Sequence, residues 1–115
     1  MNDWELIRRF AETRDETAFE RIVERHGPSV LASARRQVGP DAAEDVVQSV
    51  FLVLARKAGS LRRDVVLSSW LFRTTGFVVA QVRRREARRW HREERTAMNP
   101  TESPTAELPD DLRQN

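Results

Sequence analysis

The stretch from residue 41 to residue 58, DAAEDVVQSVFLVLARKA, constrains the fold more than any other part of the chain. It begins with Pro40-Asp41, a turn residue followed by a favourable N-cap, and Glu44 stands where a carboxylate can reach back to the backbone of the cap. Acidic residues occupy the first turn, basic residues occupy the last turn, and Gly59 follows as a stop signal. These features predict a helix over residues 41–58.

This predicted helix has an apolar stripe and a polar flank. The stripe recurs at spacings of three and four residues and contains Ala43, Val46, Val47, Val50, Phe51, Leu54 and Ala58. The flank carries Asp41, Glu44, Asp45, Gln48 and Ser49, with Leu52 and Val53 further along. Leu52 and Val53 add more apolar surface than a helix packed on one side needs. One interpretation is a central helix packed on two sides, with a solvated acidic start; the other is that the acidic flank and Leu52 dock onto a partner protein.

Length and composition favour one all-α domain. A chain of 115 residues is short for more than one domain, glycine is scarce, and no strand-like alternation appears. We expect a compact bundle of about four helices within residues 1–95. From Thr96 onward, proline, serine, threonine and acidic residues dominate, which predicts a disordered linker or tail over residues 96–115.

Several function classes find no support in the residue content. The chain has no cysteine, which excludes disulfides, thiolate catalysis and sulfur-rich zinc sites and suits a reducing cytoplasm. It shows no signal peptide and no apolar run of bilayer length, so we expect a cytoplasmic protein without a membrane partner. No nucleophile–base pair, glycine-rich phosphate loop or metal-ligand cluster appears, and His26 and His91 are interpreted as structural or surface residues. We therefore expect neither enzymatic activity nor a cofactor.

Charge is distributed unevenly along the chain. Residues 62–95 carry ten arginines against four acidic residues, a net charge of +6, whereas residues 1–27 come to −2 and residues 96–115 to −3. Nineteen of the twenty basic residues are arginine, which suits bidentate phosphate contacts and stacking on bases. The basic segment predicts binding to nucleic acid or another polyanion.

Capping signals predict the remaining helices. Asp3 can cap a first short helix, and residues 13–16, Thr-Arg-Asp-Glu, fit a capping box that starts a second one. Pro28 follows Gly27 and predicts a kink or a fresh helix start. Ser68 is a plausible cap for a last helix over residues 69–94.

The predicted last helix carries two different stripes. The inward stripe contains Trp70, Leu71, Thr74, Thr75, Val78 and Val82, and a second stripe contains Arg73, Phe77, Gln81, Arg84 and Arg88. An aromatic ring and an amide between arginines can stack on bases, hydrogen-bond to them and hold phosphates. The alternative for Phe77 is a core aromatic on a slightly rotated helix. Beyond Val82, the run RRREARRWHREER has no apolar stripe, so much of it must face solvent or a polyanion, or pair internally through Arg–Glu contacts.

Three segments of the chain belong together: HGPSVLASARRQVG, DAAEDVVQSVFLVLARKAGSLR and SSWLFRTTGFVVAQVRRREARR. Together they resemble region 2 of the extracytoplasmic-function sigma factors of bacterial RNA polymerase, and the resemblance covers residues 14–92. The block DAAEDVVQ, followed after two residues by FLVLARKAGS, is the most specific part. The resemblance implies a transcription initiation factor that binds the core polymerase and recognises and melts the promoter minus-ten element.

The resemblance also implies roles for particular residues. The helix that docks on the clamp coiled coil of the polymerase β′ subunit would carry Asp41, Glu44, Asp45, Gln48, Ser49 and Leu52. The connection that holds a base flipped from the non-template strand would run from Arg62 and Arg63 to Ser68. Promoter DNA would further contact Arg73, Phe77, Gln81, Arg84, Arg85 and Arg88. An anti-sigma factor is a further partner that the resemblance implies, and we expect a monomer.

The chain departs from the family pattern at two positions and in its extent. Many relatives carry asparagine or aspartate where this chain has Phe77 and Gln81, so the base preference cannot be transferred. Full-length relatives have a second helical domain that reads the minus-35 element, and the present sequence stops in what resembles the linker before it. Two alternatives stay open: a stand-alone basic helical module that coats DNA or RNA, and a domain that only binds proteins.

Overall fold

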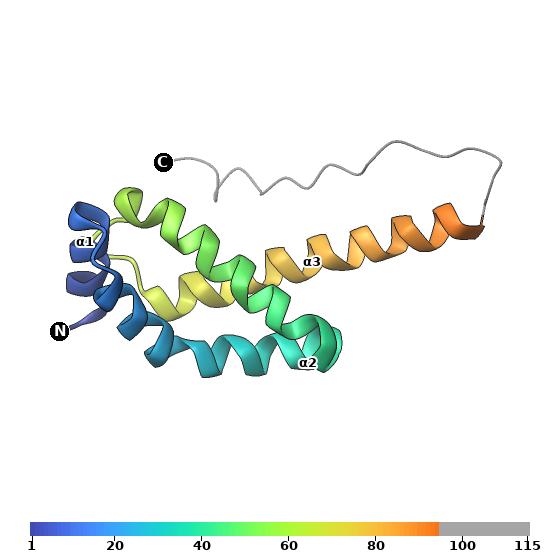
Figure 1. Cartoon of the computed structure of the whole chain (residues 1–115), viewed down its shortest axis with the longest axis horizontal. Helices are drawn as coiled ribbons and strands as arrows, with labels where there is room; N and C mark the ends of the chain where they lie inside the picture. The colour runs from blue at the N-terminus through green and yellow to red at the C-terminus, as the bar shows by residue number, and fades with distance from the viewer. Residues whose placement is uncertain (95–115) are drawn as a thin grey trace.

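The computed structural model describes residues 1–94, and all regular secondary structure in that part of the chain is helical. Helix α1 spans Asp3–Thr13, α2 spans Glu16–Lys57, a 3-10 turn η1 spans Ala58–Ser60, and α3 spans Leu67–Glu94 (Figure 1). The all-α prediction is confirmed. The tail predicted for residues 96–115 lies outside the described residues.

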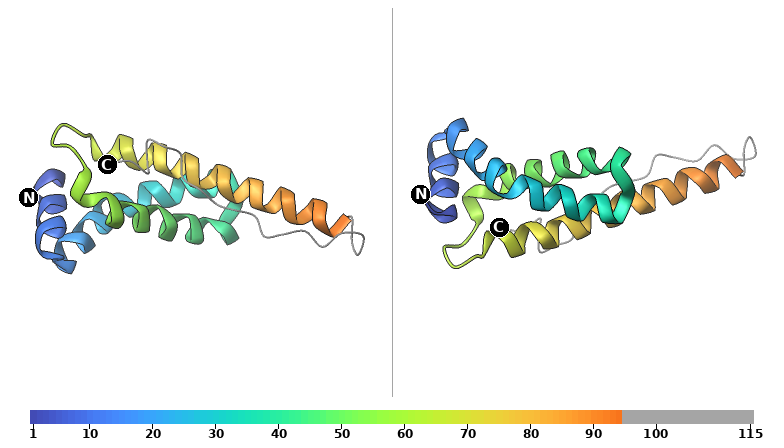
Figure 2. Two further views of the ribbon diagram at one scale, coloured as in Figure 1. Left: turned by 90° about the horizontal axis from the view of Figure 1, so that it is seen from above. Right: turned by 90° about the horizontal axis from the view of Figure 1, so that it is seen from below.

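Helix α2 is bent back on itself at Gly39, so its two parts pack as separate helical segments beside α1 and α3. Gly39 has φ 83° and ψ 171°, a backbone conformation that is essentially restricted to glycine. The first arm of α2, residues 16–38, and its second arm, residues 40–57, therefore run back along one another (Figures 1 and 2). Where about four helices were expected, residues 1–94 form three α-helices, of which α2 supplies two packing units. The helix predicted over residues 41–58 corresponds to the second arm.

Pro28 does not restart the helix. Helix α2 runs through Gly27 and Pro28, and the only residue inside it with non-helical dihedral angles is Gly39. Proline removes one backbone hydrogen bond, but Ile22 and Val30 on either side are buried in the core. Tertiary packing therefore holds the helix across the proline, and the expected fresh start is wrong.

The caps lie close to the predicted positions but not on them. Asn2 caps α1 in a capping box with Glu5, rather than Asp3. Asp15 caps α2 by accepting from the backbone N–H of residues 17 and 18, rather than Thr13. Helix α3 begins at Leu67, so Ser68 lies inside its first turn and is not the cap. In each case the helix is predicted correctly and its first residue is not.

The core lies between the two arms of α2, α1 and the first half of α3. The most deeply buried side chains come from all of these elements, namely Leu6, Ile22, Val46, Val50, Leu54, Leu71 and Val79. Thr74 and Thr75 are also fully buried, and their hydroxyls donate to the carbonyls of Trp70 and Leu71 at 2.8 and 2.7 Å. The predicted inward stripe of α3 is confirmed, with Val82 partly buried at its end. Beyond Val82, α3 projects past the bend of α2 (Figure 1).

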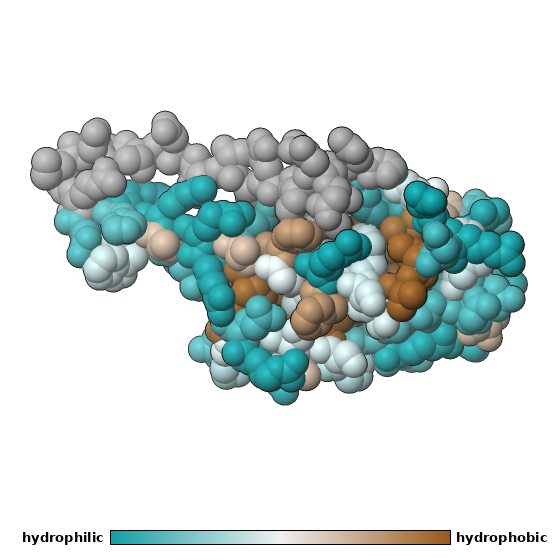
Figure 3. Space-filling view, turned by 180° about the vertical axis from the view of Figure 1, so that it is seen from behind, coloured by the Kyte–Doolittle hydropathy of each residue, from teal (hydrophilic) through white to brown (hydrophobic). Residues whose placement is uncertain are grey.

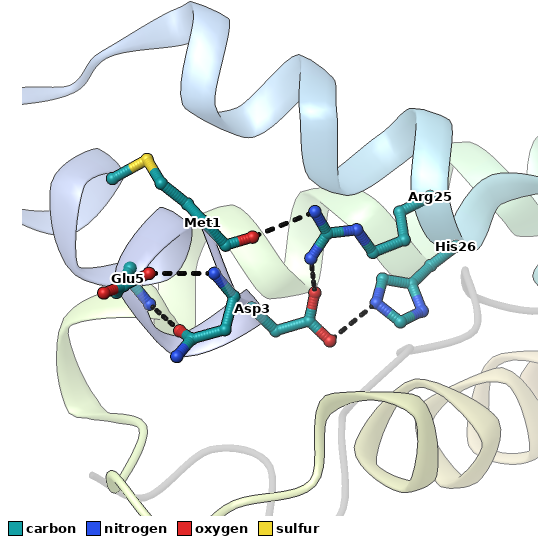
Figure 4. A network of polar contacts seen from close by, with 6 residues as sticks. Met1, Asp3, Glu5, Arg25 and His26 are labelled. Carbon is teal, nitrogen blue, oxygen red and sulfur yellow. Dashed lines mark hydrogen bonds and ion pairs between the residues drawn. The ribbon is translucent and has the colours of Figure 1, made fainter.

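Asp3 ties α1 to the first arm of α2. Its carboxylate accepts from Arg25 Nη1 at 2.7 Å and lies 2.9 Å from His26 Nε2, while Arg25 Nη2 donates to the carbonyl of Met1 at 3.0 Å (Figure 4). The His26 side chain is only 13% exposed. His26 is therefore part of a helix–helix contact, which agrees with its interpretation as a structural residue.

Candidate nucleic-acid and protein interfaces

The polar flank of the second α2 arm is fully open to solvent. Every residue of the predicted docking set is exposed, and we call this set the acidic arm face: Asp41, Glu44, Asp45, Gln48, Ser49 and Leu52. Leu52 is 57% exposed, whereas its neighbours Phe51 and Val53 are buried. Among residues 1–94, no ion pair engages the three acids of this face. An exposed leucine beside unpaired carboxylates forms a surface suited to a partner with basic and apolar groups.

The connection between η1 and α3 borders an open hollow, here called the loop hollow. Its lining residues are Arg62, Asp64, Val65, Val66, Ser68, Ser69, Trp70, Phe72 and Arg73. Val66 and Phe72 are 61% and 68% exposed, so apolar side chains face solvent next to two arginines. Arg62 also lies 3.8 Å from Asp64 in a pair that is almost fully exposed. The hollow thus combines flat apolar surface, hydroxyls and cations, which can stack a base, hydrogen-bond to it and hold a phosphate.

The second predicted stripe of α3 is open only in part. Phe77 and Gln81 are half-buried, and Phe77 packs against the core with one side. Arg84, Arg85 and Arg88 are exposed, one or two turns further along the projecting end. Apolar side chains gather where α3 packs on the bundle, while the projecting end is hydrophilic (Figure 3). Phe77 therefore packs on the core in part and stays accessible in part, and its role in nucleic-acid binding stays a prediction.

The predicted nucleic-acid residues of the connection line two different hollows. Arg62, Ser68 and Arg73 line the loop hollow. Arg63 instead lines an open surface formed otherwise by Met1 and residues of α1, among them Trp4 and Arg8. The side chains of Arg62 and Arg63 therefore border different surfaces.

Two exposed aromatic residues were not predicted as site residues. Phe72 lies between the loop hollow and a crevice of about 140 Å³ that separates the start of α3 from the first arm of α2. Trp90 is 59% exposed near the end of α3. Phe72 lies outside the inward stripe of α3, and Trp90 lies in the arginine-rich run, which has no apolar stripe. An aromatic residue at a position that the apolar pattern leaves to solvent is the signal that could have identified both.

Within the described residues, neither a metal-ligand cluster nor a membrane-spanning helix is found. No group of three or more histidine and acidic side chains is placed to hold a metal ion in residues 1–94. None of the helices in this part of the chain is both long and apolar enough to cross a bilayer. Arrangement and charge instead define the class: a helical domain with an exposed acidic face and an exposed arginine-rich face on adjacent elements.

Comparison of the sequence with models of known protein families identifies the family of this helical domain. Residues 22–89, more than half of the chain, match the model of sigma-70 region 2. The chain therefore belongs to the sigma-70 region 2 family, whose domains serve transcription initiation by binding core RNA polymerase and recognising the promoter minus-ten element. Neither a curated protein nor a solved structure matches the chain.

Proposed function

We propose that this domain docks on the β′ clamp of core RNA polymerase through the acidic arm face and captures unpaired non-template bases of the minus-ten element with α3 and the loop hollow. The observation that carries the proposal is the exposure of the whole acidic arm face on the element that packs directly beside α3. Because α2 and α3 share one core, a partner bound to the second arm fixes the position of α3 as well. Docking and promoter recognition then become two functions of one rigid unit.

The DNA side of the mechanism depends on different contacts for attraction and for selection. Arg84, Arg85 and Arg88 provide salt-sensitive attraction to phosphates without regard to sequence. Extruding a base costs a few kcal/mol, and stacking on an aromatic side chain returns roughly 1–3 kcal/mol per base. Phe72 at the loop hollow and the open side of Phe77 are the aromatic surfaces for this stacking. One domain offers too little stacking to open a duplex alone, so polymerase contacts must supply the remainder.

The docking half is tested by retention on an immobilised β′ clamp fragment. The double variant Asp45→Arg, Gln48→Ala reverses one charge and removes one amide on the acidic arm face, and we expect it to lose most of its retention. Glu20→Arg is the matched control, since Glu20 is an exposed acid on the first arm of α2, outside the proposed face. Equal retention of the double variant and the unchanged protein would refute docking through this face.

The DNA half is tested by competition among duplex, single-stranded and pre-melted promoter probes in the presence of core polymerase. We expect the pre-melted probe to bind best. Equal affinity for all probes, together with no dependence on polymerase, would instead favour a stand-alone basic module that coats nucleic acid. A monomer is part of the proposal, and an anti-sigma factor would inhibit it by covering the same exposed residues.

A further inference from the structure

Arg83 differs from the arginines that follow it because its guanidinium reaches across to α2. Arg83 Nη2 donates to the backbone carbonyl of Gln37 at 2.6 Å, although the two residues are 46 positions apart in sequence. The contact lies at the bend of α2, since Gln37 precedes the non-helical Gly39 by two residues. The C-terminal end of α3 projects past this bend (Figure 1).

The bend explains why this carbonyl needs a partner. In an uninterrupted helix the carbonyl of Gln37 would accept from the backbone N–H four residues later, but Gly39 is non-helical and interrupts that ladder. The carbonyls at the end of the first arm also form the negative end of its dipole, where a cation is favourable. The Gln37 side chain turns inward instead, with Nε2 donating to the carbonyl and hydroxyl of Ser33 at 3.2 and 3.1 Å. A charged donor from α3 thus completes the end of the first arm.

We infer that Arg83 is a positioning residue that fixes the promoter-contacting end of α3 relative to the acidic arm face, and that it does not contact phosphate itself. The functional consequence of this inference rests on the proposed function. The bend that Arg83 contacts leads directly into the second arm of α2, which carries Asp41, Glu44 and Asp45. Arg84 and Arg85 follow it without a bond to α2 among residues 1–94. Adjacent arginines in one run therefore have different tasks: one holds the helix in place, and the next ones contact DNA.

The chain's lack of cysteine makes the positioning directly measurable. Spin labels are attached at two exposed positions, Arg36→Cys beside the bend and Ala87→Cys one turn beyond Arg83. Pulsed electron paramagnetic resonance then reports the distance between α2 and the projecting end of α3. Arg83→Met keeps an aliphatic stem but removes the donors, and Arg84→Met is the matched control. We expect the distance distribution to broaden with Arg83→Met and to stay unchanged with Arg84→Met.

Salt-dependent binding separates positioning from phosphate contact. For a pre-melted promoter with core polymerase, each lost phosphate contact reduces the slope of log affinity against log salt by about 0.7 to 0.9. We expect Arg84→Met to reduce the slope by that amount, and Arg83→Met to weaken binding several-fold at every salt concentration with the slope unchanged.

Two results would overturn the inference: an unchanged distance distribution in Arg83→Met, or a reduced slope in that variant. Failure of the proposed function is recognised separately, because the distance measurement uses the free protein. If neither variant affects DNA binding but Arg83→Met still broadens the distribution, positioning of α3 stands and the promoter role is refuted.

Discussion

At the scale of single residues, the two phenylalanines in the first half of α3 differ in how deeply they are buried. Phe77 was predicted from its spacing with Gln81 and the arginines, yet one side of its ring packs on the core. Phe72 was missed, although it is 68% exposed beside the loop hollow. Its place outside the inward stripe indicates exposure, but its position beside the loop hollow depends on how the first arm of α2 and the connection before α3 are placed in space, which local spacing does not encode.

Substitution of Phe77 and Phe72 tests whether each ring contributes to stability, to DNA binding or to both. We expect Phe77→Ala to destabilise the domain by about 2 kcal/mol, less than for a fully buried ring, and also to weaken binding to single-stranded promoter DNA. Phe72→Ala should change stability by less than about 0.5 kcal/mol. It should nevertheless weaken that binding by roughly 5- to 150-fold, the equivalent of one lost stacking contact. Chemical denaturation and fluorescence anisotropy with a polymerase-bound probe measure the two quantities.

Phe77→Leu is the control, because leucine retains much of the apolar volume but has no ring. Near-native stability with weakened DNA binding is expected of it. If Phe72→Ala binds the probe as tightly as the unchanged protein, the loop hollow is not the stacking site.

At the scale of helices, sequence patterns predicted which segments are helical and which faces are buried, but not where each helix begins. The reason is visible at α1, where Asn2 and Asp3 are both good caps. Asp3 is engaged by Arg25 and His26 from α2, so Asn2 takes the cap. That choice depends on a contact between residues more than twenty positions apart. The exposed acidic arm face, by contrast, was predictable because its exposure follows from the apolar stripe on the same helix.

Loss of the Asp3 contact should loosen α1. We expect Asp3→Ala to destabilise the domain by about 1 kcal/mol, because it leaves the largely buried His26 and the exposed Arg25 without their shared acceptor. Asp64→Ala is the matched control, since the pair that it breaks is almost fully exposed and should contribute nothing measurable. Urea denaturation compares the variants, and faster amide exchange confined to α1 would localise the effect. Equal midpoints for the two variants would contradict an anchoring role for Asp3.

At the scale of the whole molecule, a single backbone bend places the two proposed binding surfaces side by side. Gly39 reverses α2, so that the second arm, which carries the acidic arm face, returns along the first arm and lies in the same bundle as α3 (Figure 2). The turn was predictable from Gly39-Pro40, because glycine followed by proline interrupts a helix. Arg83 of α3 donates a hydrogen bond to the carbonyl of Gln37 at the same bend. The spatial relation between the two proposed binding surfaces is therefore set at one junction.

The bend can be tested by adding one methyl group. At Gly39 a Cβ would meet no atom within 4 Å, so any cost of Gly39→Ala comes from the positive φ and not from a clash. We expect this variant to be destabilised by about 1–3 kcal/mol. Gly76→Ala is the opposite case, because Gly76 lies in α3 with open space around it, and alanine there should stabilise the domain by up to about 1 kcal/mol. Thermal unfolding should therefore shift in opposite directions for the two substitutions. A neutral Gly39→Ala would mean that α2 reaches its reversal through another backbone conformation, and the shared junction between the two surfaces would then lose its physical basis.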